Sequence, residues 1–285
     1  MPEAEVKDNS YNNMDKKEYR DIYREPIIGK ITQGTIFNGA KSRRYPGSLS
    51  VCGIIISPRC DIEQKKAPLY YYLPAIKMED WMKVDFPPLY IAALEKEVKS
   101  VLKSTLYECK ESETILAKFT PSEVERIIRK HKPQLKTNVE NKMEVWKAIE
   151  NYKQGGSFKD ITDRDTSNVC KNIFDELITH KNSSFYFLEN EHEDGGFILR
   201  MREISRVSPE ILFRLANGID GKLTDQELEE NDLRQLEDEE IYMPMYVVKS
   251  PFIEHIMQHF LQQFNKIGIE DVPKVFSNRF TDLIK

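Results

Sequence analysis

A cysteine and an aspartate follow an apolar run of this chain, in the segment CGIIISPRCDIEQKK that begins at Cys52. Cys60 is a candidate nucleophile, because the neighbouring Arg59 would lower the pKa of its thiol. A thiol enzyme also needs a base, commonly histidine, and none of the five histidines lies near Cys60 in the sequence. In the alternative interpretation Asp61 caps a turn and Cys60 is a small buried side chain. We favour the turn, since catalytic thiols are rare among cysteines.

The same segment contains the triplet Glu63-Gln64-Lys65, close to Asp61. One class of metal-dependent nucleases places an acid and an E-x-K triplet on adjacent strands. Here the triplet falls in a predicted turn and no second acid accompanies it, so we expect no metal site. The four cysteines are scattered and form no close pairs, which argues against a zinc site and a disulfide framework. We therefore predict reduced thiols and no cofactor.

Basic residues gather in the sequence around Cys60, namely Arg43, Arg44, Arg59, Lys65, Lys66 and Lys77. On one rim of a folded sheet these side chains would form a contact surface for RNA or another phosphate. As separate loop charges they would only be solvated. Three consecutive tyrosines, 70–72, alternate faces along a predicted strand, so at least one points outward and can stack on a base. The residues selected as substrate or nucleic-acid contacts are Arg59, Cys60, Asp61, Lys65, Lys66 and Tyr71.

The composition is that of a folded protein with its own core. The chain has 285 residues, of which 40% are hydrophobic and 31% charged, and its formal net charge is -5. Proteins that bind nucleic acid through bulk charge are usually basic, so such a contact would need a local patch here. The N-terminus has no apolar core of a signal peptide, and no run approaches the roughly 18 apolar residues of a membrane span. We expect a cytoplasmic protein without membrane contact.

The hydrophobic periods divide the chain into an α+β arrangement. Residues 1–25 form a polar N-terminal tail. Strand patterns occupy 26–77 and return after 183, and we assign 26–77 and 183–285 to one discontinuous domain with C-terminal helices. Residues 78–182 have a helical period throughout and form a helical insertion.

Two strand patterns flank the Cys60 segment. Residues 51–56 are apolar at consecutive positions, which predicts a central strand buried on both faces. The run APLYYYLPAI (67–76) predicts the next strand of a hairpin, and a second hairpin is predicted from 183–190 and 196–207. In the last predicted strand, 241–250, Pro244 argues for a sheet edge.

Capping signals mark several helices. Thr120 with Glu123 and Thr224 with Glu227 have the spacing of capping boxes, and Ser208 precedes a proline at a first helical position. The second box predicts an acidic helix over 225–240. A final helix over 251–267 has a broad apolar face.

The strand segments taken together resemble the PemK/MazF-like family of small β-barrels. Members begin with a GDVY-type strand, continue through a basic loop to a strand like RPVLVIS, and reach a strand that ends in VAAI. The counterparts here are Gly34-Thr35-Ile36-Phe37, the loop with Arg43 and Arg44, residues 53–57, and LYYYLPAI at 69–76. The run GFILRMREISRVSPEIL (196–212) is similar to the late strand and helix of the family.

The resemblance implies a small SH3-like or PemK-like barrel that the helical insertion interrupts. Such toxins cleave RNA without a metal, and in them an arginine and a threonine attend the scissile phosphate. Carried over, the arginine falls on Arg43 or Arg44 and the threonine on Lys77. A lysine can balance charge on a phosphate but lacks the donor and acceptor roles of a hydroxyl.

A looser resemblance links the Cys-Asp turn to uncharacterised bacterial proteins that we associate with mobile or defence gene clusters. We therefore expect a bacterial binding protein of a stress or phage-defence system, which contacts a partner protein or RNA, with a homodimer left open. The alternative is a metal-independent endoribonuclease of the toxin class of toxin–antitoxin pairs. A thiol enzyme built on Cys60 comes third.

Overall fold

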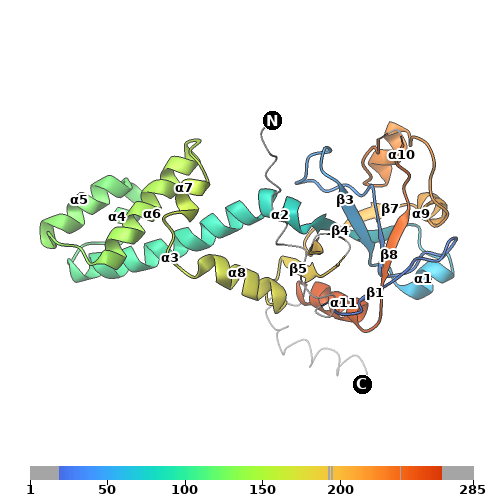
Figure 1. The fold of residues 1–285 in the computed structure, drawn as a ribbon, viewed down its shortest axis with the longest axis horizontal. Coiled ribbons are helices and arrows are strands. Elements are labelled where there is room, and N and C mark those ends of the chain that lie inside the picture. Colours follow the sequence, from blue (N-terminus) through green and yellow to red (C-terminus); the bar gives the residue numbers. More distant parts are fainter. Residues whose placement is uncertain (1–18, 192, 194, 238, 265–285) are drawn as a thin grey trace, which may run out of the picture. The chain divides into compact units, whose positions relative to one another are not determined.

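The structure, a computed structural model, describes residues 19–191, 193, 195–237 and 239–264 (Figure 1). Most of the predicted tail 1–25 and the end of the predicted helix 251–267 lie outside these residues. The chain forms two compact units. Of the described residues, the helical unit contains 19–20, 42–51 and those within 75–199, and the sheet unit contains 21–41, 52–74 and those within 200–264.

Eight strands and eleven helices occur in the described part of the chain. The strands are β1 (Tyr23–Arg24), β2 (Thr35–Phe37), β3 (Val51–Ile55), β4 (Tyr70–Lys77), β5 (Phe185–Leu188), β6 (Phe197–Arg200), β7 (Ser205–Val207) and β8 (Pro244–Val248). The helices are α1 (Arg59–Glu63), α2 (Met78–Val84), α3 (Phe86–Glu108), α4 (Ile115–Lys118), α5 (Pro121–His131), α6 (Thr137–Lys153), α7 (Lys159–Thr162), α8 (Val169–Ile178), α9 (Pro209–Leu215), α10 (Asp225–Glu230) and α11 (Phe252–Gln262). The predicted α+β class is confirmed.

The strands form a curled, antiparallel half-barrel sheet in the order β1-β8-β2-β3-β4-β6-β5, with β7 also paired to β4. Within the sheet unit β2 pairs with β3 on one side and β8 on the other. Strand β4 belongs to both units, since residues 70–74 count with the sheet unit and 75–77 with the helical unit.

The hairpin around the Cys60 segment is built as predicted. Every residue of β3 is buried, and the Ile56 N–H donates to the Tyr71 carbonyl at 2.9 Å. Tyr70 and Tyr72 are fully buried, whereas Tyr71 is 44% exposed. The predicted alternation of the three tyrosines is therefore confirmed, with Tyr71 on the outside.

The predicted strand 196–207 is two strands. β6 pairs with residues 75–77 of β4, and β7 pairs with residues 70–72 of the same strand. Between them the Glu203 N–H donates to the Arg200 carbonyl at 3.2 Å, and the Arg200 side chain forms an ion pair with Glu203 at 2.7 Å. The chain therefore turns out of the ladder and re-enters it, which the strand period alone does not reveal.

The prediction that Pro244 marks an edge strand is wrong, because β8 lies between β1 and β2. Strand β1 has only two residues, and it pairs with Val247 and Val248 at the other end of β8. On the β2 side the register shifts next to Phe37, the partner of Pro244. A proline at the start of a strand and beside a bulge does not have to donate a ladder hydrogen bond.

Helices α2 to α8 follow one another between β4 and β5, and in Figure 1 helices α4 to α7 lie along α3. Leu94, Val98, Leu102 and Leu106 are fully buried along α3, a spacing of one helical face. Aromatic rings join α2, α3, α8 and β5, with Trp81 5.4 Å from Phe185 between ring centroids. Among the described helices, none combines the length and apolar character that crossing a bilayer requires.

The predicted capping boxes at Thr120 and Thr224 are both present, as is the Ser208 cap. The acidic helix is shorter than predicted, because α10 ends at Glu230. Beyond it, Leu233 and Leu236 are buried in the sheet unit. Their burial explains why the chain leaves the helix where it does.

Gly53 of β3 lies where two buried rings meet. A Cβ at this position would lie 2.6 Å from the Phe37 ring and 2.8 Å from the Tyr72 ring, and neither ring is solvent-exposed. We expect Gly53→Ala to lower the free energy of unfolding by about 1–3 kcal/mol, the usual cost of an overpacked core. The measurement is the midpoint of urea denaturation followed by circular dichroism.

Gly47→Ala is the matched control, because no heavy atom lies within 4 Å of its added Cβ. Its midpoint should equal or slightly exceed that of the unsubstituted protein, since alanine restricts the unfolded chain. Equal midpoints for the two variants would contradict the packing described around Gly53.

Candidate functional site

The segment predicted as a turn contains the short helix α1 and a helix-ending motif. The Lys65 N–H donates to the Ile62 carbonyl at 3.3 Å and the Lys66 N–H to the Asp61 carbonyl at 3.2 Å. Lys65 has φ +52°, the left-handed conformation in which such motifs end a helix. The E-x-K triplet therefore lies at the end of a helix and not on a strand. Among the described residues, no group of three or more His, Cys, Asp or Glu side chains has the arrangement of a metal site.

The interpretation of Cys60 as a buried side chain is wrong, since Cys60 is exposed. Asp61 does not cap α1 through its side chain, and its Oδ1 lies 3.7 Å from the Cys60 Sγ. The Arg59 guanidinium, on which activation of the thiol would depend, forms an ion pair with Glu254 at 2.9 Å. The structure therefore supports neither Cys60 as an activated nucleophile nor Asp61 as the cap of a turn in which Cys60 is buried.

Two basic residues that the family resemblance selects are held by carboxylates within the helical unit. The Arg44 Nε lies 2.7 Å from Asp85 Oδ1, and the Tyr45 hydroxyl donates to the other carboxylate oxygen at 2.8 Å. Lys77 Nζ lies 2.8 Å from Glu193 Oε2. Lys77 and Asp85 are the capping residues at the two ends of α2.

The tyrosine selected for base stacking is available on the surface of the sheet unit. The Tyr71 N–H donates to the Ser57 hydroxyl at 2.7 Å, and the residue is 44% exposed. Its neighbour Tyr72 is buried, and burial raises the pKa of Tyr72 far above its ordinary value. The Tyr72 hydroxyl donates to the Asp232 carbonyl, so Tyr72 has a structural role.

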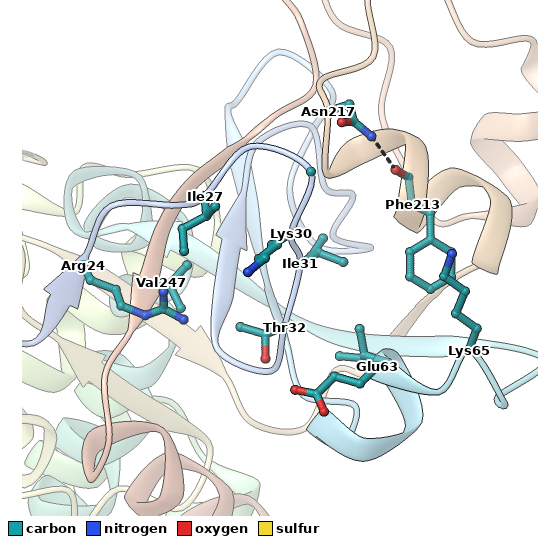
Figure 2. A pocket seen from close by; sticks show the side chains of 12 residues that line it. Arg24, Ile27, Lys30, Ile31, Thr32, Glu63, Lys65, Phe213, Asn217 and Val247 are labelled. Carbon is teal, nitrogen blue, oxygen red and sulfur yellow. Dashed lines mark hydrogen bonds between the residues drawn. The ribbon is translucent and has the colours of Figure 1, made fainter.

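A cavity of about 630 Å³ in the sheet unit is the candidate functional site (Figure 2). Its walls come from the loop 25–34 between β1 and β2, from α1 and its C-terminal turn, from α9, and from β8. The volume is in the range of about 300–1,000 Å³ that small-ligand pockets usually have. Of the selected contact residues, only Lys65 lines the cavity.

Backbone hydrogen bonds hold the loop 25–34 in place. The Lys30 N–H donates to the Ile27 carbonyl at 2.9 Å, and Gly29 between them has φ +77°, as at the third position of a type II turn. The Gly29 N–H itself donates to the Ala216 carbonyl at the end of α9, at 2.9 Å. The turn is therefore tied to the opposite wall of the cavity.

The charged side chains of the cavity are mainly positive. Arg24 of β1 and Lys30 of the loop come from one wall, and Glu63 and Lys65 come from α1 and its C-terminal turn (Figure 2). Among the described residues, Arg24 and Lys30 form no ion pair or side-chain hydrogen bond. Arg24, Lys30 and Lys65 outnumber the one carboxylate, Glu63, so the described lining has an excess of two positive charges. The chain as a whole has a net charge of -5.

Lys65 and Phe213 form the wall opposite the loop. The Lys65 ammonium lies 4.7 Å from the centroid of the Phe213 ring, within the range of a cation–π contact. Tyr70 packs edge-to-face with the same ring, with centroids 5.8 Å apart. Asn217, one turn further along the chain, donates to the Phe213 carbonyl at 3.3 Å, and its side-chain oxygen lies beside Gly29.

This arrangement is suited to binding an anion. The cavity offers a guanidinium, two ammonium groups, the Thr32 hydroxyl and the Asn217 amide. None of the described residues that line it is a histidine or a cysteine. Sequence reasoning missed Arg24 and Lys30, whose only signal is a charge at each end of the run REPIIGK.

The different exposure of the cysteine thiols gives a direct test of whether Cys60 is the nucleophile of a thiol enzyme. Because Cys60 is exposed while Cys52 and Cys109 are buried, we expect iodoacetamide to modify Cys60 first in the folded protein, as read by peptide mass spectrometry. Without an activating partner its rate should be close to that of glutathione in the same buffer. A rate more than about tenfold above glutathione would instead indicate a stabilised thiolate and a thiol enzyme. Cys60→Ser, which should remove the fast-reacting site, is the control.

No family model, curated protein or solved structure matches this chain. The PemK/MazF-like resemblance therefore stays a prediction, and function has to be inferred from the site.

Proposed function

We propose that this protein is a binding protein whose sheet unit holds an acidic segment of a partner protein in the cavity. The observation that carries the proposal is that Arg24, Lys30 and Lys65 line one cavity while none of them pairs with a carboxylate in the described residues. Basic side chains of a folded surface that have no internal carboxylate leave their charge for an external one.

The contrast with three of the basic residues that the sequence analysis selects supports this choice. Arg44, Arg59 and Lys77 each lie within 3 Å of a carboxylate oxygen. An incoming phosphate would have to displace these carboxylates. An anion that binds in the cavity would displace no carboxylate from Arg24, Lys30 or Lys65, because none of them is paired with one in the described residues.

Three features favour a protein partner over RNA. The chain as a whole is acidic, which opposes the approach of a long polyanion such as RNA more than that of a short acidic segment. The cavity contains the carboxylate of Glu63, and Phe213, the one aromatic residue among its described lining residues, is covered by Lys65. Single strands are usually bound by exposed aromatic rings and by many phosphate contacts, whereas a few carboxylates suffice to match a local excess of two charges.

The half-barrel sheet is consistent with a PemK/MazF-like barrel kept as a binding scaffold, in a bacterial stress or defence system as the resemblance implies. The same fold often supports unrelated functions, because function depends on the side chains of a site. A metal-independent ribonuclease, the alternative that the resemblance also implies, would need Arg43 or Arg44 and Lys77 at one phosphate. Arg44 and Lys77 are held at opposite ends of α2, which at 1.5 Å per residue are about 10 Å apart.

The binding proposal is tested with fluorescein-labelled octaglutamate and fluorescence anisotropy. We expect saturable binding that weakens as NaCl rises from about 0.05 M to about 0.5 M, since salt screens exposed charges. The double variant Arg24→Ala/Lys30→Ala should bind about tenfold more weakly, because each exposed ion contact contributes up to about 1 kcal/mol. Glu63→Gln should strengthen binding a few-fold, since it removes the one repelling charge.

Lys96→Ala is the matched control, because Lys96 is an exposed lysine of α3 that has no ion pair and lies outside the cavity. It should leave binding unchanged. If a labelled single-stranded RNA binds more tightly than octaglutamate, and the Arg24→Ala/Lys30→Ala variant weakens that complex, the ligand is nucleic acid and the proposal is wrong. A loss in Lys96→Ala about half as large, in free energy, as that in the double variant, which removes two charges instead of one, would show that only the net charge of the protein matters and would contradict the proposal.

The ribonuclease alternative makes a separate prediction. On incubation with single-stranded RNA in EDTA we expect no cleavage on a denaturing gel, and no difference between the unsubstituted protein and Arg44→Ala or Lys77→Ala. Metal-free cleavage that both substitutions abolish would establish the alternative.

A further inference from the structure

We propose that the acidic segment also carries an aliphatic side chain, which enters an apolar recess beside the cavity. This inference rests on the proposed function and specifies the chemistry of the partner. The recess has a volume of about 170 Å³ and is lined mainly by apolar residues of the loop 25–34, of the end of α9, and of the chain entering β8. Ile27 and Asn217 line both the recess and the cavity. The two sites therefore adjoin, and one short segment can reach both.

Large aliphatic side chains are exposed around the recess to an unusual degree. Ile28 is 88% exposed and Ile27 50%, and Ile241 and Met243 are 41% and 42% exposed. These four are among eleven large hydrophobic side chains that are exposed in the described part of the chain. Their concentration at one recess is the pattern of an interaction surface, because single exposed hydrophobic residues are normally scattered.

The backbone holds these side chains in their exposed positions. Ile28 stands at the tip of the turn that the Lys30 N–H to Ile27 hydrogen bond closes. On the other side, the Met243 N–H donates to Asn38 Oδ1 at 2.7 Å, and the Asn38 amide donates to the Ile241 carbonyl at 2.8 Å. A surface fixed in advance loses little conformational entropy on binding, which favours its use as a docking site.

The chemistry of the recess selects the occupant. Its described lining contains isoleucine, methionine, proline and alanine side chains, and none of these described residues has an aromatic ring on which a nucleic-acid base would stack. The neighbouring cations select carboxylates at the same time. A segment that combines glutamate or aspartate with leucine, isoleucine or valine satisfies both sites.

The experiment compares octaglutamate with a peptide of the same length in which the two central glutamates are leucines. We expect the leucine peptide to bind about tenfold more tightly, the gain for partial burial of a leucine side chain. Ile28→Ser combined with Ile241→Ser should abolish this gain and leave octaglutamate binding unchanged. Ile28→Leu should retain it.

Ile204→Ser is the matched control, because Ile204 is 43% exposed in the same unit but does not line the recess. It should keep the full gain. If octaglutamate binds and the leucine peptide binds no more tightly, this inference is wrong while the proposed function stands. If octaglutamate does not bind, the proposed function itself is wrong.

Two further outcomes would overturn the inference. A leucine gain that survives Ile28→Ser/Ile241→Ser would place the aliphatic contact elsewhere. Analytical ultracentrifugation checks the remaining occupant, a second copy of this chain. If the unsubstituted protein is a dimer and Ile28→Ser/Ile241→Ser is a monomer, the recess is a subunit interface.

Discussion

Backbone hydrogen bonds fix the loop 25–34 within the sheet unit, and the proposed binding surface depends on them. The Gly29 N–H donates to the end of α9, while Gly34 donates to Ile55 of β3 and accepts from Val248 of β8. Both glycines have positive φ, a conformation that other residues adopt only with strain. These bonds position Lys30 at the cavity and Ile28 in solvent, although removing an isoleucine side chain from water is favourable.

Ion pairing separates Arg44, which binds a carboxylate of the same chain, from Arg24 and Lys30, which bind none in the described residues. Arg44 joins the carboxylate of Asp85, whose side chain is 4% exposed, and such a buried carboxylate requires a cation and hydrogen bonds in the folded state. Arg24 and Lys30 have no comparable partner in the described residues, so their charge acts outward. A basic residue near a predicted hairpin is therefore not by itself a phosphate contact, since its carboxylate partner decides what it can bind.

Much of the fold follows from local patterns. The capping boxes at Thr120 and Thr224, the helical period of 78–182 and the buried strand β3 are all read correctly, because neighbours along the chain determine caps and periods. The errors occur where distant segments intervene. Pro244 lies inside the sheet because the short strand β1 returns to cover β8, and α10 ends early because Leu233 and Leu236 are needed in the core.

The sequence by itself determined the α+β class, the alternation of the three tyrosines and the presence of basic residues around the first hairpin. Only the tertiary structure decided which of them remain unpaired, since the carboxylates that bind Arg44 and Lys77 come from distant positions in the chain. It also decided that Ile27 and Ile28 are exposed, although their residue type favours burial. The physical reason is the same in both cases: charge pairing and burial depend on contacts across the fold, which spacing along the chain does not specify.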